Sequence, residues 1–498
     1  MIDVNEIFSK YYEEKERWVS ARRASQVISD PFSLWAEYNA PVEEKEELNE
    51  YQKLLFSRGN EHEERVVKEL FTDALVTEYA TPAEGFKKVL EWMQQGVTQI
   101  SNAPIFHKDL EANGVVDVLE KRTGKNSVFG DYYYVVKEIK QVRNIKPKHR
   151  LQAAFYNLVI GLIQGYTPQE FYLINQDSQT STYEYDIVLE ESIKENIKLA
   201  KELMTGKLLP SPTYEGSSWP WSSYANKLAK KNKDISLITS VGASMKKKLN
   251  EAGYYTLQDM ANTTVQELKK VKGIGELKAK NFVLSAQSLA ENKIILTNPE
   301  NIVFEKKLYE LYVDFEGVEE VTDTGFTINM DYLIGVLQKN MNTNEEKFIP
   351  FLAHKLSHEN RMLKEFLKHL QNLEGDFVIY HYHHYERTHF VKMFKQYNTP
   401  NHLQELVLNN LVDLYKIATT SAVYPTTGNG LKALAKSFGF SWRQNDVNAM
   451  ESIALYLDYV KNGVKESLQK AVDYNEDDCV ATRVIRDKLE ELKNEKKE

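Results

Sequence analysis

Two regions of the sequence combine strand patterns with helix patterns, and a polar segment separates them. The first region runs from residue 1 to about 215, and the second runs from about 305 to the C-terminus. A chain of 498 residues is too long for one hydrophobic core, because single cores stop growing at about 250–300 residues. We therefore expect an α/β protein of several domains, in which each region encloses its own core.

The first region predicts two strands between two helices. Apolar residues alternate with other residues over 114–120 (GVVDVLE) and 132–140 (YYYVVKEIK), as they do in strands. Apolar residues recur at helical spacing over 51–70 and again from residue 150. This order predicts an α/β domain at 1–215.

The rest of the chain predicts three further segments. A polar stretch rich in serine and lysine is typical of a linker, which we place at 216–234. Two short helix-turn-helix patterns then predict a small helical module at 235–295. The stretch 305–498 contains three strand patterns (KLYELYVDFEG, DYLIGVLQ and DFVIYHYH) together with several helix patterns, and it predicts a second α/β domain.

The composition excludes several classes of protein. The single cysteine, Cys479, excludes an intrachain disulfide and any cysteine-based zinc or iron–sulfur site. No run of about 18 apolar residues could span a membrane. The charged start, MIDVNEIFSKYYEEKERW, has no signal-peptide pattern. We therefore expect a cytoplasmic protein with no membrane partner.

The first group of candidate catalytic residues lies in the first region. Divalent cations promote phosphodiester hydrolysis, and hard cations such as Mg²⁺ or Mn²⁺ bind carboxylate oxygens. Asp117 lies on one predicted strand, and Glu138 and Lys140 lie two residues apart on the next, so that their side chains share a face. Gln152 and Tyr156 lie four residues apart on the following helix, again on one face. A Glu-x-Lys on a strand is, by itself, more commonly part of a solvated face.

The order of these residues resembles the RecB-like branch of the PD-(D/E)XK nucleases, whose signature is Asp, then Glu-x-Lys, then Gln-x-x-x-Tyr. Gly59-x-x-x-Glu63 matches the helical first motif of that branch. The resemblance implies a restriction-endonuclease-like core in which three carboxylates bind metal, a lysine assists catalysis and two residues contact DNA. These roles fall on Glu63, Asp117 and Glu138, on Lys140, and on Gln152 and Tyr156. His62 is an alternative metal ligand, because many relatives have histidine in the first motif.

One departure from that branch is informative. Many of its members carry a cysteine quartet after the Gln-Tyr helix, and this quartet holds an iron–sulfur cluster. Here the comparable stretch reads SSWPWSSY, with serines where cysteines are expected. We therefore expect no iron–sulfur cluster, and we expect the segment to be held by packing around Trp219 and Trp221.

The segment between the two regions combines glycine turns with basic residues. Gly273-Ile274-Gly275 predicts a tight turn before a helix that starts near Glu276, and glycine permits the positive φ that such a turn needs. Lys272, Lys278 and Lys280 add positive charge, which matters more locally than the net charge of −9 does. This segment resembles a pair of helix-hairpin-helix motifs, and the resemblance implies sequence-independent binding to the DNA backbone. The alternative is a turn that only packs two domains together.

A second group of candidate catalytic residues lies in the second α/β region. Asp314 and Glu316 lie two residues apart in a strand pattern, so that both carboxylates share a face. Tyr474 and Asp478 lie four residues apart in a helix pattern and also share a face. Two carboxylates from a strand and one from a helix could hold two metal ions about 4 Å apart, with the tyrosine near the attacking water.

This second group resembles the DEDD exonucleases of the RNase H-like fold, in the subtype with a tyrosine. The Asp-x-Glu opening and the Tyr-x-x-x-Asp close match that subtype. The family's second motif normally supplies an aspartate, and here Glu386 would have to serve in its place, with Asp413 as a supporting candidate. His381, His383 and His384 could suggest zinc, but we favour contact with nucleic acid or a structural role for them.

The sequence as a whole predicts a DNA nuclease with two active sites that depend on Mg²⁺ or Mn²⁺. The domain order resembles a family of RecB-like nucleases that are sometimes fused to helicases, which makes a helicase a candidate partner. The C-terminal site would act 3′→5′, as its relatives do, in DNA repair, recombination or phage defence.

Three alternatives remain open at this point. One site could be active while the other domain only binds nucleic acid. The chain could instead be a non-catalytic DNA-binding partner of a helicase, although acidic clusters are unfavourable against phosphate. RNA also remains open as a substrate, because metal-site chemistry does not distinguish the sugars.

Overall fold

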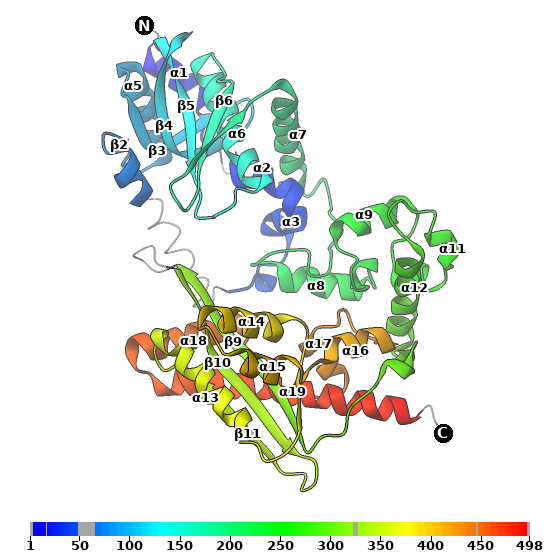
Figure 1. The fold of residues 1–498 in the computed structure, drawn as a ribbon. Helices are drawn as coiled ribbons and strands as arrows, with labels where there is room; N and C mark the ends of the chain where they lie inside the picture. Colours follow the sequence, from blue (N-terminus) through cyan, green and yellow to red (C-terminus); the bar gives the residue numbers. More distant parts are fainter. Residues whose placement is uncertain (1–2, 16, 48–64, 322–326, 445–446, 496–498) are drawn as a thin grey trace. The chain divides into compact units, whose positions relative to one another are not determined.

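The computed structural model describes residues 3–15, 17–47, 65–321, 327–444 and 447–495. The chain divides into two units, Met1–Leu228 and Ala229–Glu498 (Figure 1). None of the described helices is long and apolar enough to cross a membrane. Glu63, His62 and most of the helix expected at 51–70 lie outside the described residues, while 65–70 is helical as predicted.

Unit 1 is built on a seven-stranded mixed sheet with the order β2-β3-β4-β5-β6-β7, in which β1 also pairs with β4. The long central strands β3, β4 and β5 are antiparallel to their neighbours in this group, and β6 runs parallel to β5. The strands are β1 Val19–Ser20, β2 Leu75–Val76, β3 Gln99–His107, β4 Ala112–Ser127, β5 Gly130–Ile139, β6 Glu170–Ile174 and β7 Thr180–Glu184. The strands predicted at 114–120 and 132–140 are therefore confirmed in β4 and β5.

Helices cover this sheet and bury its apolar side chains. Helix α6 contacts β3, β4, β5 and β6, and α5 contacts β3 and α1. The helix predicted from residue 150 is confirmed as α6. The described helices of unit 1 are α1 Val4–Tyr11, α2 Ala21–Ser29, α3 Pro31–Asn39, α5 Pro82–Gln95, α6 Pro147–Gln164, α7 Ile187–Met204 and α8 Ser222–Lys231, which reaches into unit 2, with a 3₁₀ turn at Val42–Glu44.

The stretch at 216–234, which the sequence predicts to be a linker, is folded. Its helix α8 follows Trp221, and Trp221 and Ala225 form one buried cluster with Phe32 and Ala36 of α3. The Asp30 carboxylate, which caps α3, also accepts a hydrogen bond of 2.7 Å from the backbone N–H of Ser218. Packing around Trp221 therefore holds a segment that the sequence suggested was only a connection.

The first part of unit 2 contains four helices, and the exposed glycine turns lie before or between them. The helices are α9 Ala243–Glu251, α10 Leu257–Ala261, α11 Val265–Leu268 and α12 Glu276–Glu291, after a 3₁₀ turn at Ile235–Leu237. The strand β8 (Ile295–Leu296) then pairs antiparallel with β14 (Ala422–Val423) of the following α/β domain. This two-strand ladder fastens the helical module to that domain.

The second α/β domain has a five-stranded sheet with the order β11-β10-β9-β12-β13. Strands β9, β10 and β11 are antiparallel to one another, whereas β12 is parallel to both β9 and β13. The strands are β9 Tyr309–Val321, β10 Thr327–Asn340, β11 Glu346–Leu352, β12 Phe377–His381 and β13 Leu411–Asp413. The three strand patterns predicted for this region are confirmed in β9, β10 and β12.

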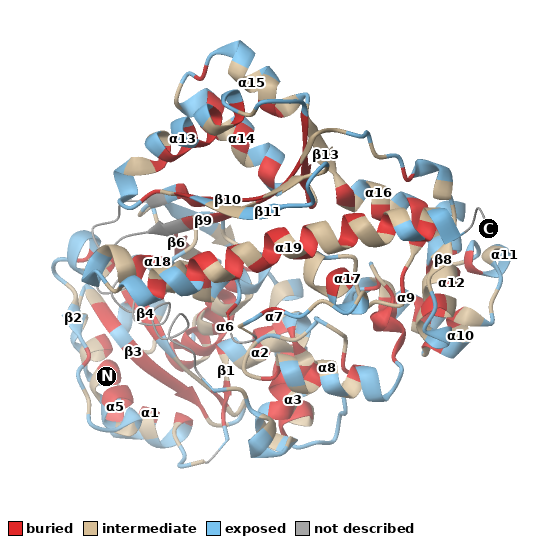
Figure 2. Ribbon diagram, turned by 90° about the horizontal axis from the view of Figure 1, so that it is seen from below, coloured by how far each residue is buried: buried red, intermediate tan, exposed pale blue. Residues whose placement is uncertain are grey.

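Helices lie on both sides of this sheet. Figure 2 shows α13, α14 and α15 on one side and the long helix α19 with α16 and α17 on the other, and separate apolar clusters fill the two interfaces. The helices are α13 Glu359–Gln371, α14 Tyr385–Gln396, α15 Asn401–Leu408, α16 Leu414–Ser421, α17 Leu431–Ser437, α18 Ala449–Asn462 and α19 Lys465–Glu495, with 3₁₀ turns at Pro299–Asn301 and Leu356–His358. The sheet therefore lies between two helical layers, and α19 crosses beneath its central strands.

Replacing Trp221 by alanine should lower the free energy of unfolding of unit 1 by about 3–5 kcal/mol, because removing a buried indole leaves a cavity. Urea denaturation followed by far-UV circular dichroism measures this change. The control is Leu209→Ala, whose side chain is 69% exposed and whose cost should stay below about 0.5 kcal/mol. Equal costs for the two variants would show that α8 contributes nothing to the stability of unit 1.

Candidate active site

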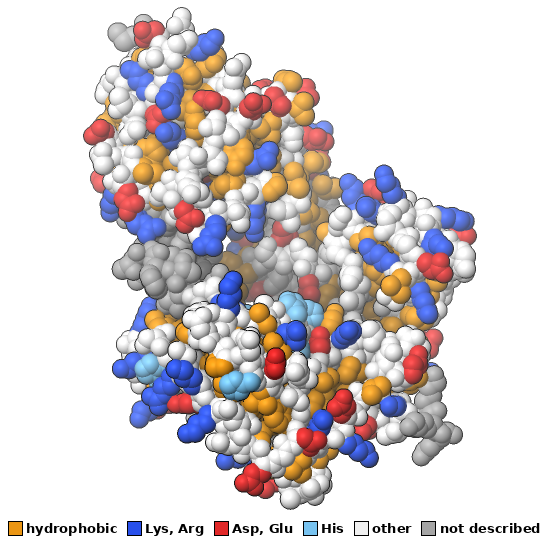
Figure 3. Space-filling view, viewed as in Figure 1, with side chains coloured by type: hydrophobic (Ala, Val, Ile, Leu, Met, Phe, Trp, Pro, Cys, Tyr) orange, Lys and Arg blue, Asp and Glu red, His pale blue; other side chains and the backbone are white. Residues whose placement is uncertain are grey.

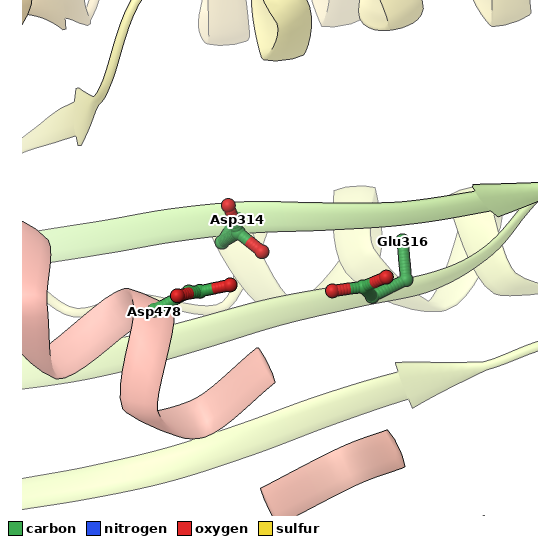
Figure 4. A group of neighbouring side chains, drawn as sticks. All are labelled: Asp314, Glu316 and Asp478. Carbon is green, nitrogen blue, oxygen red and sulfur yellow. The ribbon is translucent and has the colours of Figure 1, made fainter. Parts of the chain in front are cut away.

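Three carboxylates from β9 and α19 meet in the second α/β domain. Asp314 and Glu316 project from the same face of β9, and Asp478 projects toward them from α19 (Figure 4). One oxygen from each of the three lies within 4.8 Å of the others. Among the described residues, this is the group of at least three acidic, histidine or cysteine side chains that lie close enough together to hold a metal ion. The structure thus brings together three residues that the sequence singled out by their strand and helix spacings.

A close approach between α19 and the sheet makes this meeting possible. Gly335 of β10 lies directly opposite Asp314 in the ladder. A Cβ atom at Gly335 would lie 1.7 Å from Oδ1 of Asn475, so only glycine leaves room for α19 here. The side-chain amide of Asn475 donates a hydrogen bond of 2.8 Å to Oδ2 of Asp314. The bare backbone of β10 therefore allows α19 to orient a carboxylate of β9.

Neighbouring side chains fix the other two carboxylates. The indole N–H of Trp442 donates a hydrogen bond of 2.7 Å to Oδ1 of Asp478. The hydroxyl of Tyr332 donates to Oε2 of Glu316 over 3.3 Å, and it also contacts the Ser452 hydroxyl at 2.7 Å. Each carboxylate thus retains oxygen lone pairs that a cation could use.

Burial raises the pKa of all three carboxyl groups, and the charge of Asp478 adds to this effect for Asp314 and Glu316. Burial, followed by the charges of Asp478 and Glu316, raises the pKa of Asp314 well above its usual range. Burial and the charge of Asp478 raise the pKa of Glu316 to about 8. Burial raises the pKa of Asp478 to about 6, against the opposing effects of Trp442 and Lys432. Negative charge at this site is therefore undercompensated by the protein's own groups, which favours the binding of a cation.

Tyr474 and Glu386, which the sequence also singled out, lie at the border of this group. Tyr474 is buried one turn before Asp478, and burial followed by the charge of Asp478 raises its pKa, so its phenol remains protonated. Glu386, at the start of α14, is close enough for its charge to raise the pKa of Asp314. Its Oε2 lies 3.3 Å from Nδ1 of His381, yet neither atom makes a hydrogen bond. A buried carboxylate oxygen without a donor is suited to a metal or a bound substrate.

Asp413 and the three histidines that the sequence singled out also make structural contacts. Asp413 caps α16, accepting hydrogen bonds of 2.9 Å from the N–H of Tyr415 and 3.0 Å from the N–H of His383. The rings of His383 and His384 contact each other, and His381 is buried beside Glu386. Within the described ranges, no histidine belongs to a group of three or more side chains that lie close enough together to hold a metal ion. The zinc alternative therefore has no support, and a structural or substrate-contacting role remains for these histidines.

Sequence reasoning missed several residues beside the carboxylates. The Lys432 amine lies 4.6 Å from the ring centre of Tyr474, and burial lowers its pKa while the charge of Asp478 opposes this. Nearby, Nδ1 of His389 lies 2.7 Å from the fully buried Asp331. Lys432 comes from a segment with no spacing relation to the carboxylates. The sequence signal that could have marked this segment is a glycine-rich stretch before a helix start, TTGNGLKALAK.

In unit 1, the structure brings together three of the residues that the sequence predicted. Oδ2 of Asp117 accepts a hydrogen bond of 2.6 Å from the N–H of Ile139, and the Lys140 amine lies 2.6 Å from Oε1 of Glu138. Glu138 is 2% exposed, its Oε2 is buried without a hydrogen-bond donor, and burial raises its pKa. This buried carboxylate pair with a lysine has the donors for a hard cation.

The helix α6 presents the other two residues of that group to neighbouring elements. The side-chain amide of Gln152 donates a hydrogen bond of 3.2 Å to the hydroxyl of Ser25 in α2. The ring of Tyr156 packs over Gly114 of β4, where a Cβ atom would lie 2.3 Å from it. Both side chains thus point toward other parts of unit 1.

The glycine turn before α12 has the geometry that the sequence predicted. Gly273 has a φ of +91°, and Gly275 caps α12 without a side-chain hydrogen bond to its first turn. Lys272 and Lys280 are exposed and Lys278 is half-buried. In Figure 3 basic side chains are frequent over the helices α9, α11 and α12. In the first hairpin, by contrast, Lys246 is buried in an ion pair of 2.7 Å with Asp234.

Comparison with known families identifies two parts of the chain. Residues 311–490 match the RNase H superfamily, and residues 233–288 match the SAM-like helix-hairpin-helix tandem. Unit 2 therefore contains an RNase H superfamily domain and a helix-hairpin-helix tandem. With the carboxylate group inside the matched domain, these findings support a nuclease that acts on nucleic acid. The resemblance of unit 1 to RecB-like nucleases stays a prediction.

The similar proteins cover shorter parts of the chain. A DNA repair and recombination protein RadA from Methanoculleus marisnigri is 38% identical over 58 residues, which are 12% of this chain and 18% of RadA. RadA from Aeropyrum pernix is 35% identical over 103 residues, 21% of this chain and 28% of that protein. The chain thus spans less than a third of these relatives. A solved structure, "3′-end specific recognition of histone mRNA stem-loop by 3′-exonuclease", has 10% identity and a TM-score of 0.24, and the match covers 49% of this chain and 86% of that one.

Replacing Gly335 by alanine should displace Asn475 and destabilise unit 2 by about 1–3 kcal/mol, because the added methyl overlaps the side chain of Asn475. Chemical denaturation followed by circular dichroism measures this change. Gly428→Ala is the control, since a Cβ atom there meets nothing within 4 Å and its φ is not positive. A Gly335→Ala protein as stable as Gly428→Ala would contradict the close approach of α19.

The metal-free protein should lose stability as the pH rises from about 4.5 to 8. The pKa of Glu316 is raised from 4.5 to about 8 by folding, so its stabilisation is complete below 4.5 and lost as the pH passes 8. Asp478 acts likewise as the pH rises from 3.8 through about 6. Thermal unfolding in EDTA across this range measures the loss, and Glu316→Gln should reduce it. If the difference in stability between wild type and Glu316→Gln did not change with pH, the pKa of Glu316 would not be raised by folding.

Proposed function

We propose that the chain is a divalent-metal-dependent nuclease that hydrolyses phosphodiester bonds of DNA at the three-carboxylate site of its RNase H superfamily domain. The observation that carries this proposal is the convergence of Asp314, Glu316 and Asp478 within 4.8 Å in that domain. Burial and, second, the charges of neighbouring carboxylates raise the pKa of Asp314 and Glu316, so these groups are costly to keep ionised without a cation. A site that maintains this cost is suited to binding cations.

The donor set fits Mg²⁺ or Mn²⁺. All three side chains offer carboxylate oxygens, which hard divalent cations prefer. Glu386 adds a buried oxygen without a hydrogen-bond donor. By the family resemblance, Glu386 would take the place that an aspartate holds in the second motif. Asp314, Glu316 and Asp478 would hold the cations, which would neutralise the phosphate and lower the pKa of the attacking water.

Other side chains of the domain would position the substrate. The Tyr474 phenol stays protonated because its pKa is raised, so it can donate a hydrogen bond to a water or phosphate oxygen. The Lys432 amine lies over the ring of Tyr474 and supplies a positive charge on the side of the site where Tyr474 lies. Asn475 and Trp442 would keep Asp314 and Asp478 in the orientation that cation binding requires.

We propose DNA as the substrate, with release of nucleotides from a 3′ end. The helix-hairpin-helix tandem and the DNA repair and recombination proteins among the relatives support DNA. Lys272, Lys278 and Lys280 beside the Gly273–Gly275 turn would contact phosphates, so that binding should weaken steeply as salt rises. DNA repair, processing of recombination ends and defence against phage DNA are tasks that such an activity serves, and a helicase that unwinds the substrate is a candidate partner.

We further propose a second nuclease site in unit 1. Asp117 and Glu138 would bind a cation there, and Lys140 would stabilise the charge that develops at the phosphate. The contact between Lys140 and the buried Glu138 supports this assignment, since an exposed Glu-x-Lys pair would not be so enclosed. Glu63 or His62 would complete the ligands by the family resemblance, and Gln152 and Tyr156 would contact the DNA strand.

A nuclease assay on end-labelled DNA with Mg²⁺ or Mn²⁺ tests both sites. Asp314→Asn should reduce one set of products by at least about 100-fold, because it removes a charge that the transition state needs. Lys140→Ala should reduce a different set, and the double variant should be inactive. Asp413→Asn is the control, because Asp413 caps α16 and lies outside the carboxylate group, so its products should match wild type.

Distinct outcomes separate the proposals. Loss of all products in Asp314→Asn alone would leave unit 1 as a nucleic-acid-binding part without activity. Cleavage that neither variant changes would contradict both sites. DNA binding without cleavage under any metal would replace the nuclease with a non-catalytic DNA-binding protein. Parallel assays with single-stranded and duplex RNA decide the sugar preference.

A further inference from the structure

A groove lies within unit 2, between the helix-hairpin-helix tandem and the RNase H superfamily domain. Its volume is about 580 Å³, which is within the range of about 300–1,000 Å³ typical of ligand pockets. One wall comes from the start of α12 and the loop of the first hairpin, and the other comes from α16, β14 and the loop before α17. The groove is lined by Thr239, Ser240, Gly275, Glu276, Leu277, Lys278, Asn281, Phe282, Ser285, Tyr415, Thr419, Ala422, Val423, Tyr424 and Asn429.

The walls combine aromatic rings with neutral hydrogen-bonding groups. Tyr415 and Thr419 lie one helical turn apart on α16, opposite Asn281 and Lys278 of α12. The one carboxylate in the lining belongs to Glu276, which is exposed and paired at 2.8 Å with Lys269. Such walls suit a nucleic-acid strand. Aromatic rings can stack on its bases, while amide, hydroxyl and lysine groups can bind its sugars and phosphates.

Two sets of contacts connect residues that line the groove with the three-carboxylate site. The ring of Tyr415 lies 4.3 Å from the ring of His383. His381, two residues earlier on the same segment, lies 3.3 Å from Glu386, whose charge acts on Asp314. Tyr415, in the wall of the groove, is therefore connected to the carboxylates through His383, His381 and Glu386.

The second set of contacts runs through the loop before α17. The backbone carbonyl of Asn429, which lines the groove, accepts a hydrogen bond from the hydroxyl of Tyr382. Lys432 follows in the first turn of α17 and lies against Tyr474. The wall of the groove and the cationic side of the site are thus parts of one short segment.

We propose that this groove holds the single-stranded DNA segment that leads the terminal nucleotide into the carboxylate site, with Tyr415 as a stacking surface for a base. The proposal rests on the proposed nuclease function and adds the path and strandedness of its substrate. A base can stack on Tyr415 only when it has left its duplex, and a cavity of this size suits one strand rather than two. The helix-hairpin-helix tandem then serves as one wall of a strand channel.

A matched pair of substitutions on α16 tests the path. Thr419 lines the groove, whereas its neighbour Thr420 is exposed and does not. Thr419→Glu places a negative charge against the DNA phosphates and should weaken binding of a 12-nucleotide strand about tenfold, while Thr420→Glu should not. Fluorescence anisotropy measures binding in EDTA, with Asp314→Asn in both proteins, so that this result does not depend on cleavage. Equal affinities of the two variants would overturn the proposal.

A second measurement uses substrates that differ in length. With Mg²⁺ and the native Asp314, Thr419→Glu should lower kcat/KM for the 12-nucleotide strand about tenfold. It should leave hydrolysis of p-nitrophenyl thymidine 5′-monophosphate unchanged, because that ester is too short to enter the groove. An equal loss on both substrates would show that Thr419→Glu damages the site itself and would overturn the proposal. If wild type hydrolyses neither substrate, the nuclease function fails, while the binding measurement still decides the groove.

The stacking contact has its own test. Tyr415→Phe keeps the ring, so it should preserve both the affinity and the quenching of a 2-aminopurine base placed inside the strand. Tyr415→Ala should lose the quenching and bind the strand about tenfold more weakly. Thermal unfolding verifies that each variant is folded. Unchanged quenching in Tyr415→Ala would overturn the role of Tyr415. Tighter binding of blunt duplex DNA or of a 12-nucleotide RNA would overturn the commitment to single-stranded DNA.

Discussion

The close approach of α19 to β9 and β10 determines the chemistry of unit 2. Gly335 leaves the space that Asn475 occupies, and this contact brings Asp478 against Asp314 and Glu316. Three carboxylates in a partly buried setting repel one another, so packing along the rest of α19 has to offset that repulsion. Its buried residues Ile485 and Leu489 provide such packing beneath the sheet. Stability in one half of the helix thus supports an unfavourable arrangement in the other.

The two acidic groups manage buried negative charge differently. In unit 1, the Lys140 amine lies 2.6 Å from Glu138 and pairs with it directly. In unit 2, Lys432 is the neighbouring cation that acts on the pKa of Glu316 and Asp478, yet their pKa values stay raised. Burial raises the pKa of Glu138 as well, so in both groups the protein's own cation leaves the buried carboxylates undercompensated.

Periodic patterns predicted much of this architecture, because strands and helices place residues two and four apart on one face. The pairs Asp314 with Glu316 and Tyr474 with Asp478 could be found in this way. Trp442 and Lys432 could not, since each reaches the site only through tertiary packing of a segment without its own spacing signal. Asp413, a supporting acidic candidate in the sequence, caps α16, which is a role that an aspartate before a helix commonly has. The packing of Trp221 likewise depends on a partner helix far away in sequence.

The ladder between β8 and β14 ties the helix-hairpin-helix tandem to the α/β domain at a fixed spacing. A hydrogen bond of 3.5 Å from the Ser288 hydroxyl of α12 to the carbonyl of Val423 strengthens the same junction. A DNA strand that is bound by both the helix-hairpin-helix tandem and the α/β domain would need a minimum length to reach from one to the other. If the chain digests DNA as proposed, a remnant shorter than that length would be held at one of the two places only and would dissociate. The length of the remaining fragment would then be set by the distance between these two parts of the protein.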